Sequence, residues 1–293
     1  MKRTNRTIII GLILCLVIGS AVGIAGGYGG VQVSGIALFS ICALLAFAVN
    51  WLAFIPANMA QTEKYYDLTG GISYLSVITV ALILTPELDT RAKLVAVMVI
   101  LWTVRLAGFL FMRICQDGHD GRFDEIKIRP LRFFFAWTLQ GLWVLLTVSC
   151  ALVIITSNVS KPIGMIGSIG VLMWLMGFLI ESVADAQKRA FKRDPQNKDR
   201  FITTGLWAWC QQPNYFGEIL LWFGVMVMAL PILQGWQWAC VISPFFVMFL
   251  LTKVSGIPML REKADKKWGE DSDYQNYVAN TPVLIPMPPK KAL

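Results

Sequence analysis

The sequence predicts an all-α fold, a polytopic bundle of transmembrane helices, from three observations. Of its 293 residues, 56% are hydrophobic and only 15% are charged, whereas about a quarter of a soluble domain is charged. The apolar residues form long uninterrupted runs, and a helix that is apolar all round needs lipid or other helices on every side. The cationic residues gather in alternate connecting segments. We therefore expect an integral membrane protein with a single membrane-embedded domain, residues 1–293.

Eight runs approach the length of about 20 residues that a helix needs to cross a bilayer. They comprise residues 7–27, 35–56, 68–86, 93–113, 131–156, 163–183, 216–232 and 236–254. The first run follows three cationic residues, as in a signal peptide. Its length favours an uncleaved anchor helix within residues 1–34. Cleavage would leave seven spans.

The distribution of lysine and arginine predicts the orientation, because these residues are retained on the cytoplasmic side. If the N-terminus is cytoplasmic, 22 of the 26 cationic residues fall in inside segments and three in outside loops. The remaining one, Arg105, lies within a span, where an unpaired arginine is costly. Asp67 or Glu63 is its expected partner. Both termini are therefore predicted to be cytoplasmic, and so is the active site.

The composition also argues against several kinds of site. The net charge of +8 follows from the retention of cations inside, and the chain lacks the basic–aromatic pattern of a nucleic-acid surface. Its six cysteines are scattered without a C-x-x-C pair, which indicates neither zinc nor a disulfide framework. A single histidine, His119, is too little for a Ser-His-Asp or Cys-His set. We expect no metal and no nucleic-acid partner.

The segment "ESVADAQKRAFKRDP" places charged residues where a helix leaves the bilayer. Asp185, Arg189 and Lys192 lie at i, i+4 and i+7 and share one helix face, and Pro195 stops the helix. Cations there can simply extend to the headgroups, but carboxylates near the hydrocarbon are expensive and usually functional.

The next polar segment is "QQPNYFGE", in which Asn214 and Glu218 lie four residues apart at the start of a helix. Together they could grip the amide, ribose or base of a nucleotide. They could equally be an N-cap and a carboxylate that favours the helix dipole. The ending "DSDYQNYVANTPVLIPMPPKK" suggests a short lid or tail pinned against the cytoplasmic mouth, with Tyr277 able to stack on a base or to join an interfacial belt.

These segments resemble those of steroid 5-alpha-reductase-like membrane proteins, in the branch that carries the domain of unknown function 1295. The resemblance covers residues 57–293, so the first span looks like an addition. It includes "TGLWAWCQQPNYFGEILLWFG", "LWTVRLAGFLFMR", "DGRFDEIK", "ESVADAQKRAFK", "SGIPML" and "YVANTPVLIP". The resemblance implies a helical bundle that holds NADPH in a cytoplasm-facing cavity and reduces an activated C=C bond, typically in a 3-oxo-Δ4 steroid.

It also implies site residues. The implied cofactor-binding residues are Asn214, Glu218, Asp185, Arg189, Lys192, Arg200, Arg122 and Tyr277, and their cations suit a pyrophosphate with a 2′-phosphate. Asp67 falls near the family's catalytic glutamate, but Trp102 stands near its tyrosine and cannot donate a phenolic proton. Tyr65, Tyr66 or Tyr74 would have to take the place of that tyrosine, or the substrate differs. We predict Asp67, Tyr66 and Glu63 as the catalytic set. Gln211 and Gln212 replace the common Arg-His pair before Pro213.

The expected function is NADPH-dependent reduction of a steroid- or lipid-like enone or enoyl substrate that enters from the bilayer. The membrane would be the inner membrane of a bacterium or the endoplasmic reticulum of a eukaryote. Two alternatives stay open. One is an S-adenosylmethionine-dependent methyltransferase like the isoprenylcysteine carboxyl methyltransferases, which share the RHP-x-Y-x-G pattern. The other is a lipid-binding membrane protein without catalysis.

Overall fold

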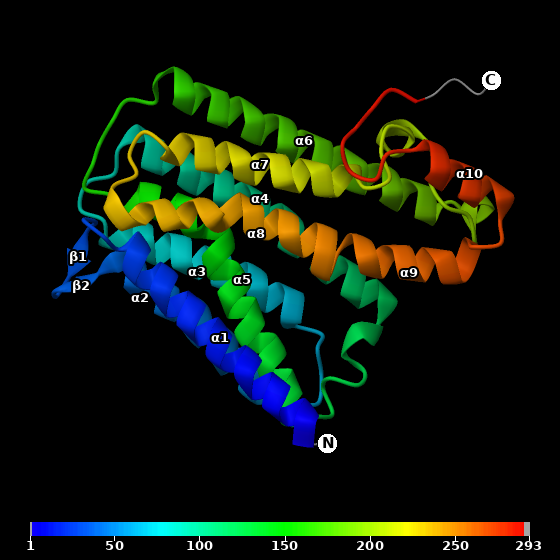
Figure 1. The fold of residues 1–293 in the computed structure, drawn as a ribbon, viewed down its shortest axis with the longest axis horizontal. Helices are drawn as coiled ribbons and strands as arrows, with labels where there is room; N and C mark the ends of the chain where they lie inside the picture. The colour runs from blue at the N-terminus through cyan, green and yellow to red at the C-terminus, as the bar shows by residue number, and fades with distance from the viewer. Residues whose placement is uncertain (1, 290–293) are drawn as a thin grey trace. The chain divides into compact units, whose positions relative to one another are not determined.

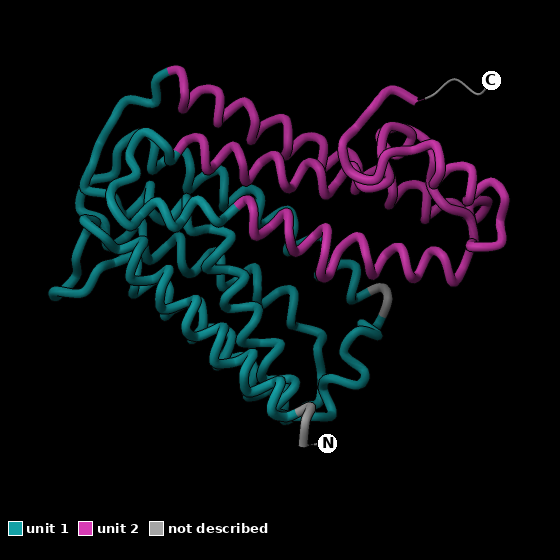
Figure 2. Tube along the Cα trace, viewed as in Figure 1, with its two compact units in different colours: residues 1–164, 229–243 teal, residues 165–228, 244–293 magenta. Residues whose placement is uncertain are grey.

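The computed structural model describes residues 2–289 and is almost entirely helical over that range, apart from one short β-hairpin (Figure 1). The chain divides into two compact units (Figure 2). Unit 1 is formed by the residues up to Gly164 together with Ala229–Ser243. Unit 2 is formed by Met165–Met228 together with the residues from Pro244 onward.

Unit 1 is built around a central helix. Its elements are α1 Lys2–Gly26, β1 Gln32–Val33, β2 Ile36–Ala37, α2 Leu38–Met59, α3 Tyr66–Leu84, α4 Thr90–Asp117 and α5 Pro130–Thr156. Every residue of α5 from Val144 to Thr156 is buried, because α1, α2, α3 and α4 all pack against this helix. An apolar helix covered on all sides needs no polar face, which explains the uninterrupted run in the sequence.

The first helix is a packed element of unit 1. A methyl group added to Gly11, Gly19 or Gly26 would lie 2.8, 2.7 or 2.4 Å from an aromatic ring. These rings belong to Phe135, Phe47 and Phe39 of α5 and α2. Small residues let membrane helices approach closely, so the glycines of α1 form the face that receives these aromatic side chains.

The connecting segments of unit 1 lie at its two ends in turn, as the distribution of lysine and arginine predicts. At one end, the Lys161 Nζ lies 2.8 Å from the Pro231 carbonyl oxygen, and Gly30 pairs with Ser157 in an isolated bridge. At the other end, the Lys127 Nζ lies 2.8 Å from Glu63. Segments predicted to share one side of the membrane are therefore held together.

Unit 2 contains all but one terminal residue each of the long helix α6 Gly164–Arg193 and of α7 Pro213–Ala229. It also contains most of α8 Ile242–Phe249, a π-helical turn Leu250–Val254, α9 Ile257–Trp268 and α10 Ser272–Asn280. Helices α6 and α7 are antiparallel, since Gly170 meets Gly224 and Gly177 meets Gly217. In each helix the two glycines are seven residues apart, so they lie on one face, two turns from each other. Helix α6 ends at Arg193, two residues before Pro195, as predicted.

Seven helical segments within the described residues are long and apolar enough to cross a membrane. They correspond to seven of the eight predicted spans. The eighth, predicted at 216–232, is α7, whose 17 residues lie at the lower limit for a spanning helix. The prediction of an all-α integral membrane protein is confirmed.

Candidate functional site

The contact between α6 and α7 brings polar side chains of unit 2 together. The buried face of α6 consists of Gly167, Gly170, Trp174, Gly177, Glu181, Ala184 and Asp185, so it begins with small residues and ends with two carboxylates. Because α7 runs antiparallel against this face, its N-terminus lies beside the carboxylates. The Asn214 Nδ2 donates a hydrogen bond to the Asp185 Oδ1 at 3.3 Å. Two predicted cofactor residues are thus in direct contact.

The two polar atoms of the Asn214 side-chain amide differ in their contacts. Its Oδ1 is buried and accepts no hydrogen bond within the described part of the chain, while its Nδ2 is fixed by Asp185. Asp185 is only 7% exposed. A buried acceptor without a donor is costly, so the arrangement favours a ligand that brings an N–H or O–H group. Asn214 also lies in the first turn of α7, where backbone N–H groups lack helical partners and the dipole is positive.

The predicted cations of unit 2 lie near the end of α6 and in the loop that follows. Lys192 and Arg200 are exposed, and Arg189 is half-buried. Exposed cations such as these can bind the phosphates of a ligand. Because they are in contact with solvent, holding their charge there carries no desolvation cost before the ligand binds. Lys188 lies elsewhere on this helix end, with its Nζ 4.5 Å from the centre of the Trp207 ring.

The loop between α6 and α7 is fixed by side chains that the sequence did not single out. The Trp207 indole N–H donates to the Ala184 carbonyl at 3.1 Å, and the Gln187 Oε1 accepts from the Leu206 N–H at 2.9 Å. Gly205 has a φ of +63°, and a Cβ there would lie 2.6 Å from the Gln187 amide. A residue other than glycine would be strained and would clash. In the sequence, the segment "TGLW" indicates the turn at Gly205.

Tyr277 contacts this same loop. Its hydroxyl donates to the Trp207 carbonyl at 2.7 Å, and its ring lies 5.8 Å from that of Phe201. Burial raises the pKa of Tyr277. The predicted role of Tyr277 at the cofactor stays a prediction, but its hydroxyl is already engaged with the loop.

The predicted catalytic residues belong to unit 1, at the end where α2 meets α3. Glu63 is 5% exposed and accepts hydrogen bonds from the Lys127 Nζ at 2.8 Å and the Asp120 N–H at 3.0 Å. Burial alone would raise the pKa of Glu63, but these two donors outweigh it and lower this pKa. Glu63 therefore holds the loop between α4 and α5 against the loop before α3.

The other two members of the catalytic set differ in their partners. The Tyr66 hydroxyl donates to the Ala136 carbonyl at 2.9 Å, and its ring packs on those of Phe123 and Trp137. The Asp67 Oδ2 lies 3.6 Å from the Arg113 Nη2. We expected Asp67 or Glu63 to pair with Arg105, but their ion-pair partners in unit 1 are Arg113 and Lys127.

Arg122, a predicted cofactor residue, lies close to Asp67 but pairs with Asp120. Its Nε donates to the Asp120 Oδ2 at 2.7 Å, and its Nη2 contacts the same oxygen. Burial would lower the pKa of Arg122, but the hydrogen bond and charge of Asp120 raise it. The guanidinium is thus charged and already binds the Asp120 carboxylate, so a phosphate would have to share the guanidinium with Asp120.

No group of three or more histidine, cysteine, aspartate or glutamate side chains in residues 2–289 could hold a metal ion.

Comparison with known proteins agrees with this architecture. The family described as "Protein of unknown function (DUF1295)" matches residues 53–281, most of the chain. Two curated relatives match over 117 residues, which is 40% of this chain and 40% of each relative. They are steroid 5-alpha-reductase DET2 of Gossypium hirsutum, 28% identical, and 3-oxo-5-alpha-steroid 4-dehydrogenase 1 of Bos taurus, 26% identical.

The chain thus spans about two fifths of the length of these relatives. No solved structure matches it. The extent of the family match, together with the apolar helices, shows that this integral membrane protein belongs to the DUF1295 family and is similar to steroid 5-alpha-reductases.

Proposed function

We propose that the protein is an NADPH-dependent oxidoreductase that reduces an activated C=C bond in a steroid- or lipid-like substrate. One observation carries the cofactor assignment. Asn214 offers a buried, unpaired Oδ1 at the N-terminus of α7, in a fixed orientation, because Asp185 binds the other end of the amide. The nicotinamide carboxamide of NADPH carries the N–H donor that this acceptor lacks.

The residues around Asn214 fit the rest of the cofactor. Arg189, Lys192 and Arg200 supply cations near the end of α6 and in the loop after it, and arginine is well suited to phosphate groups. Glu218 lies one turn after Asn214 on α7 and could accept from a ribose hydroxyl. The cofactor would then lie at the end of unit 2 that we predict to be cytoplasmic, where nucleotides are held.

When bound, NADPH would supply a hydride to the β-carbon of the substrate. The C=C electron pair would then move onto the carbonyl oxygen as an enolate, which protonated Asp67 would stabilise with a hydrogen bond, as positioned donors do in a dry site. If Asp67 transfers its proton to that oxygen, Arg113, 3.6 Å from Asp67, would stabilise the carboxylate. The α-carbon would take up a proton from water, leaving hydroxide, and the carboxylate would recover its proton as the carbonyl re-forms.

The names of the two relatives support this reaction class, since both describe steroid oxidoreductases. The substrate would reach the protein from the bilayer, because a steroid or lipid partitions there. A steroid-like enone is the substrate class that these names favour.

Nucleotide binding by the purified protein in detergent tests the proposal. NADPH at 100 times its Kd should raise the free energy of unfolding by about 2.7 kcal/mol, whereas S-adenosylmethionine should not stabilise the protein. Stabilisation by S-adenosylmethionine alone would favour the methyltransferase. If the protein binds neither compound, the lipid-binding alternative is favoured and the reductase is wrong.

A further inference from the structure

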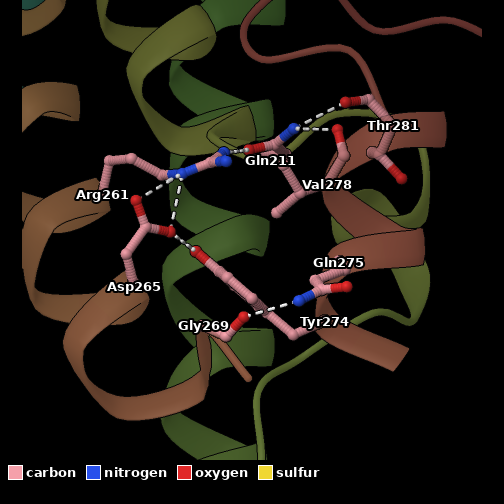
Figure 3. A network of polar contacts seen from close by, with 8 residues as sticks. All are labelled: Gln211, Arg261, Asp265, Gly269, Tyr274, Gln275, Val278 and Thr281. Atoms are coloured by element: carbon pink, nitrogen blue, oxygen red, sulfur yellow. Dashed lines mark hydrogen bonds and ion pairs between the residues drawn. The ribbon is translucent and has the colours of Figure 1, made fainter. Parts of the chain in front are cut away.

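Gln211 uses its whole side-chain amide to hold the C-terminal part of the chain (Figure 3). Its Nε2 donates to the Thr281 carbonyl at 2.6 Å and to the Val278 carbonyl at 3.2 Å. Its Oε1 accepts from the Arg261 Nη1 at 3.4 Å. Three segments of unit 2 therefore meet at this one side chain: α9, the end of α10 and the loop before α7.

Backbone hydrogen bonds extend the same attachment. The Gln211 N–H donates to the Pro282 carbonyl at 2.8 Å, and the Gln212 N–H donates to the Val283 carbonyl at 3.1 Å. The Met287 N–H donates to the Trp209 carbonyl at 3.0 Å. Three backbone hydrogen bonds thus join residues 281–287, which we call the C-terminal strap, to residues 209–212.

Arg261 connects Gln211 to a further set of contacts in Figure 3. Its Nε lies 2.9 Å from the Asp265 Oδ1, and the Tyr274 hydroxyl donates to that oxygen at 2.8 Å. Burial and this carboxylate raise the pKa of Tyr274 to about 12, so the hydroxyl keeps its proton and remains a donor. Helices α9 and α10 are thereby fixed to each other where they hold Gln211.

The other end of the loop is held by the C-terminal end of α9. The Lys267 Nζ lies 2.8 Å from the Asp199 Oδ1, and the Trp268 indole N–H donates to the Asp199 carbonyl at 2.6 Å. Asp199 directly precedes Arg200, and Gln211 lies three residues before Asn214. Both ends of the loop 199–212, which carries Arg200 and leads into Asn214, are therefore fastened to the C-terminal quarter of the chain.

We infer that Gln211, through the C-terminal strap, is a positioning residue that sets the position of Asn214 for the nucleotide. This inference rests on the proposed function. Glutamine suits the task, because its amide donates two hydrogen bonds to carbonyls while it accepts one from a guanidinium. Gln211 itself does not contact the cofactor, because both ends of its side chain are occupied by protein groups.

The test compares Gln211→Met, which keeps the length of the side chain but removes its hydrogen bonds, with Gln275→Met as the matched control. Gln275 also donates from its side chain to a backbone carbonyl, that of Gly269 at 2.7 Å, but its contact does not involve the loop. Two quantities are measured in the purified full-length chain at a temperature well below unfolding. They are the Kd for NADPH and the hydrogen exchange of peptides that cover residues 209–212 and 281–287.

Gln211→Met should raise the Kd for NADPH about tenfold, which corresponds to 1.4 kcal/mol, and should accelerate exchange in both peptides. Gln275→Met should leave the Kd and the exchange within about twofold of the wild type. If Gln211→Met does not accumulate, Gln211→Glu replaces it, because glutamate keeps a partner in Arg261 but cannot donate to the two carbonyls.

Three results are decisive. Faster exchange with an unchanged Kd would show that the strap only stabilises the fold, and the positioning role would be wrong while the proposed function stands. Unchanged exchange would show that Gln211 does not hold the strap. A wild-type protein that does not bind NADPH would overturn the proposed function itself, and the positioning role with it.

Discussion

Gly177 of α6 and Gly217 of α7 face each other so closely that a Cβ on either would lie 2.5 or 2.6 Å from the carbonyl oxygen of the other. The same Cβ on Gly217 would lie 2.6 Å from the backbone nitrogen of Glu181. Real Cβ atoms do not approach backbone this closely. The glycine of the "NYFGE" segment is thus required by helix packing, and this packing places Asn214 beside Asp185.

Gly217→Ala should therefore push α7 away from α6. We expect a loss of about 1–3 kcal/mol in the free energy of unfolding, the usual cost of overpacking. We also expect weaker NADPH binding, because the Asn214–Asp185 contact depends on this approach. Gly108→Ala is the control, since nothing lies within 4 Å of a Cβ there. The thermal stability of both variants in detergent decides the prediction, and equal melting temperatures would contradict it.

Glu63→Gln should destabilise unit 1. The substitution leaves Lys127 without its buried partner, and breaking such a pair costs about 3 kcal/mol. The effect should appear as a lower melting temperature, with NADPH affinity unchanged if Glu63 is purely structural. Glu262→Gln removes one member of an exposed pair with Lys266 and should change stability by less than about 1 kcal/mol.

The same pair predicts a dependence of stability on pH. The pKa of Glu63 is lowered on folding from 4.5, and that of Lys127 is raised from 10.5. The contribution of Glu63 is full above its unfolded pKa and is lost as the pH falls through its folded pKa. The contribution of Lys127 is full below its unfolded pKa and is lost as the pH rises through its folded pKa. The difference in melting temperature between wild type and Glu63→Gln should thus be flat between about pH 5 and 10 and shrink on further acidification.

Asn214→Ala should weaken NADPH binding about tenfold, since it removes the hydrogen bond to the cofactor, worth about 1 kcal/mol, together with the contact to Asp185. Fluorescence of the bound nicotinamide measures the affinity directly. Asn280→Ala removes an amide that donates hydrogen bonds to Asn276. This control should leave the affinity for NADPH unchanged. An unaltered Kd in Asn214→Ala would remove the observation on which the cofactor assignment depends.

Asp67→Asn and Tyr66→Phe should separate two members of the predicted catalytic set. Asp67→Asn should lower the rate of enone-dependent NADPH oxidation at least about 100-fold, as expected for the loss of a catalytic acid. Tyr66→Phe should mainly cost stability, about 1 kcal/mol, because its hydroxyl already donates to Ala136. The opposite order of rates would identify Tyr66 as the donor.

The elements that follow local rules were predictable from the sequence, and the contacts between distant segments were not. Pro195 and Pro213 indicated where α6 ends and α7 begins, because proline interrupts a helix interior and suits a first turn. The ion pair of Glu63 could not be predicted, since nothing nearby in sequence indicates Lys127, 64 residues away. The contacts of Gln211 could not be predicted either, because its side chain binds backbone carbonyls 67 and 70 residues away.

The distance in sequence between Gln211 and its strap has a consequence for biosynthesis. A ribosome makes the loop long before it makes Thr281, whereas the glycine contacts of α6 and α7 need only those two helices and can form in the bilayer. The residues that close the loop are therefore translated well after the loop itself. Nascent chains would pass through the membrane machinery with that loop still open until residues 281–287 have been made.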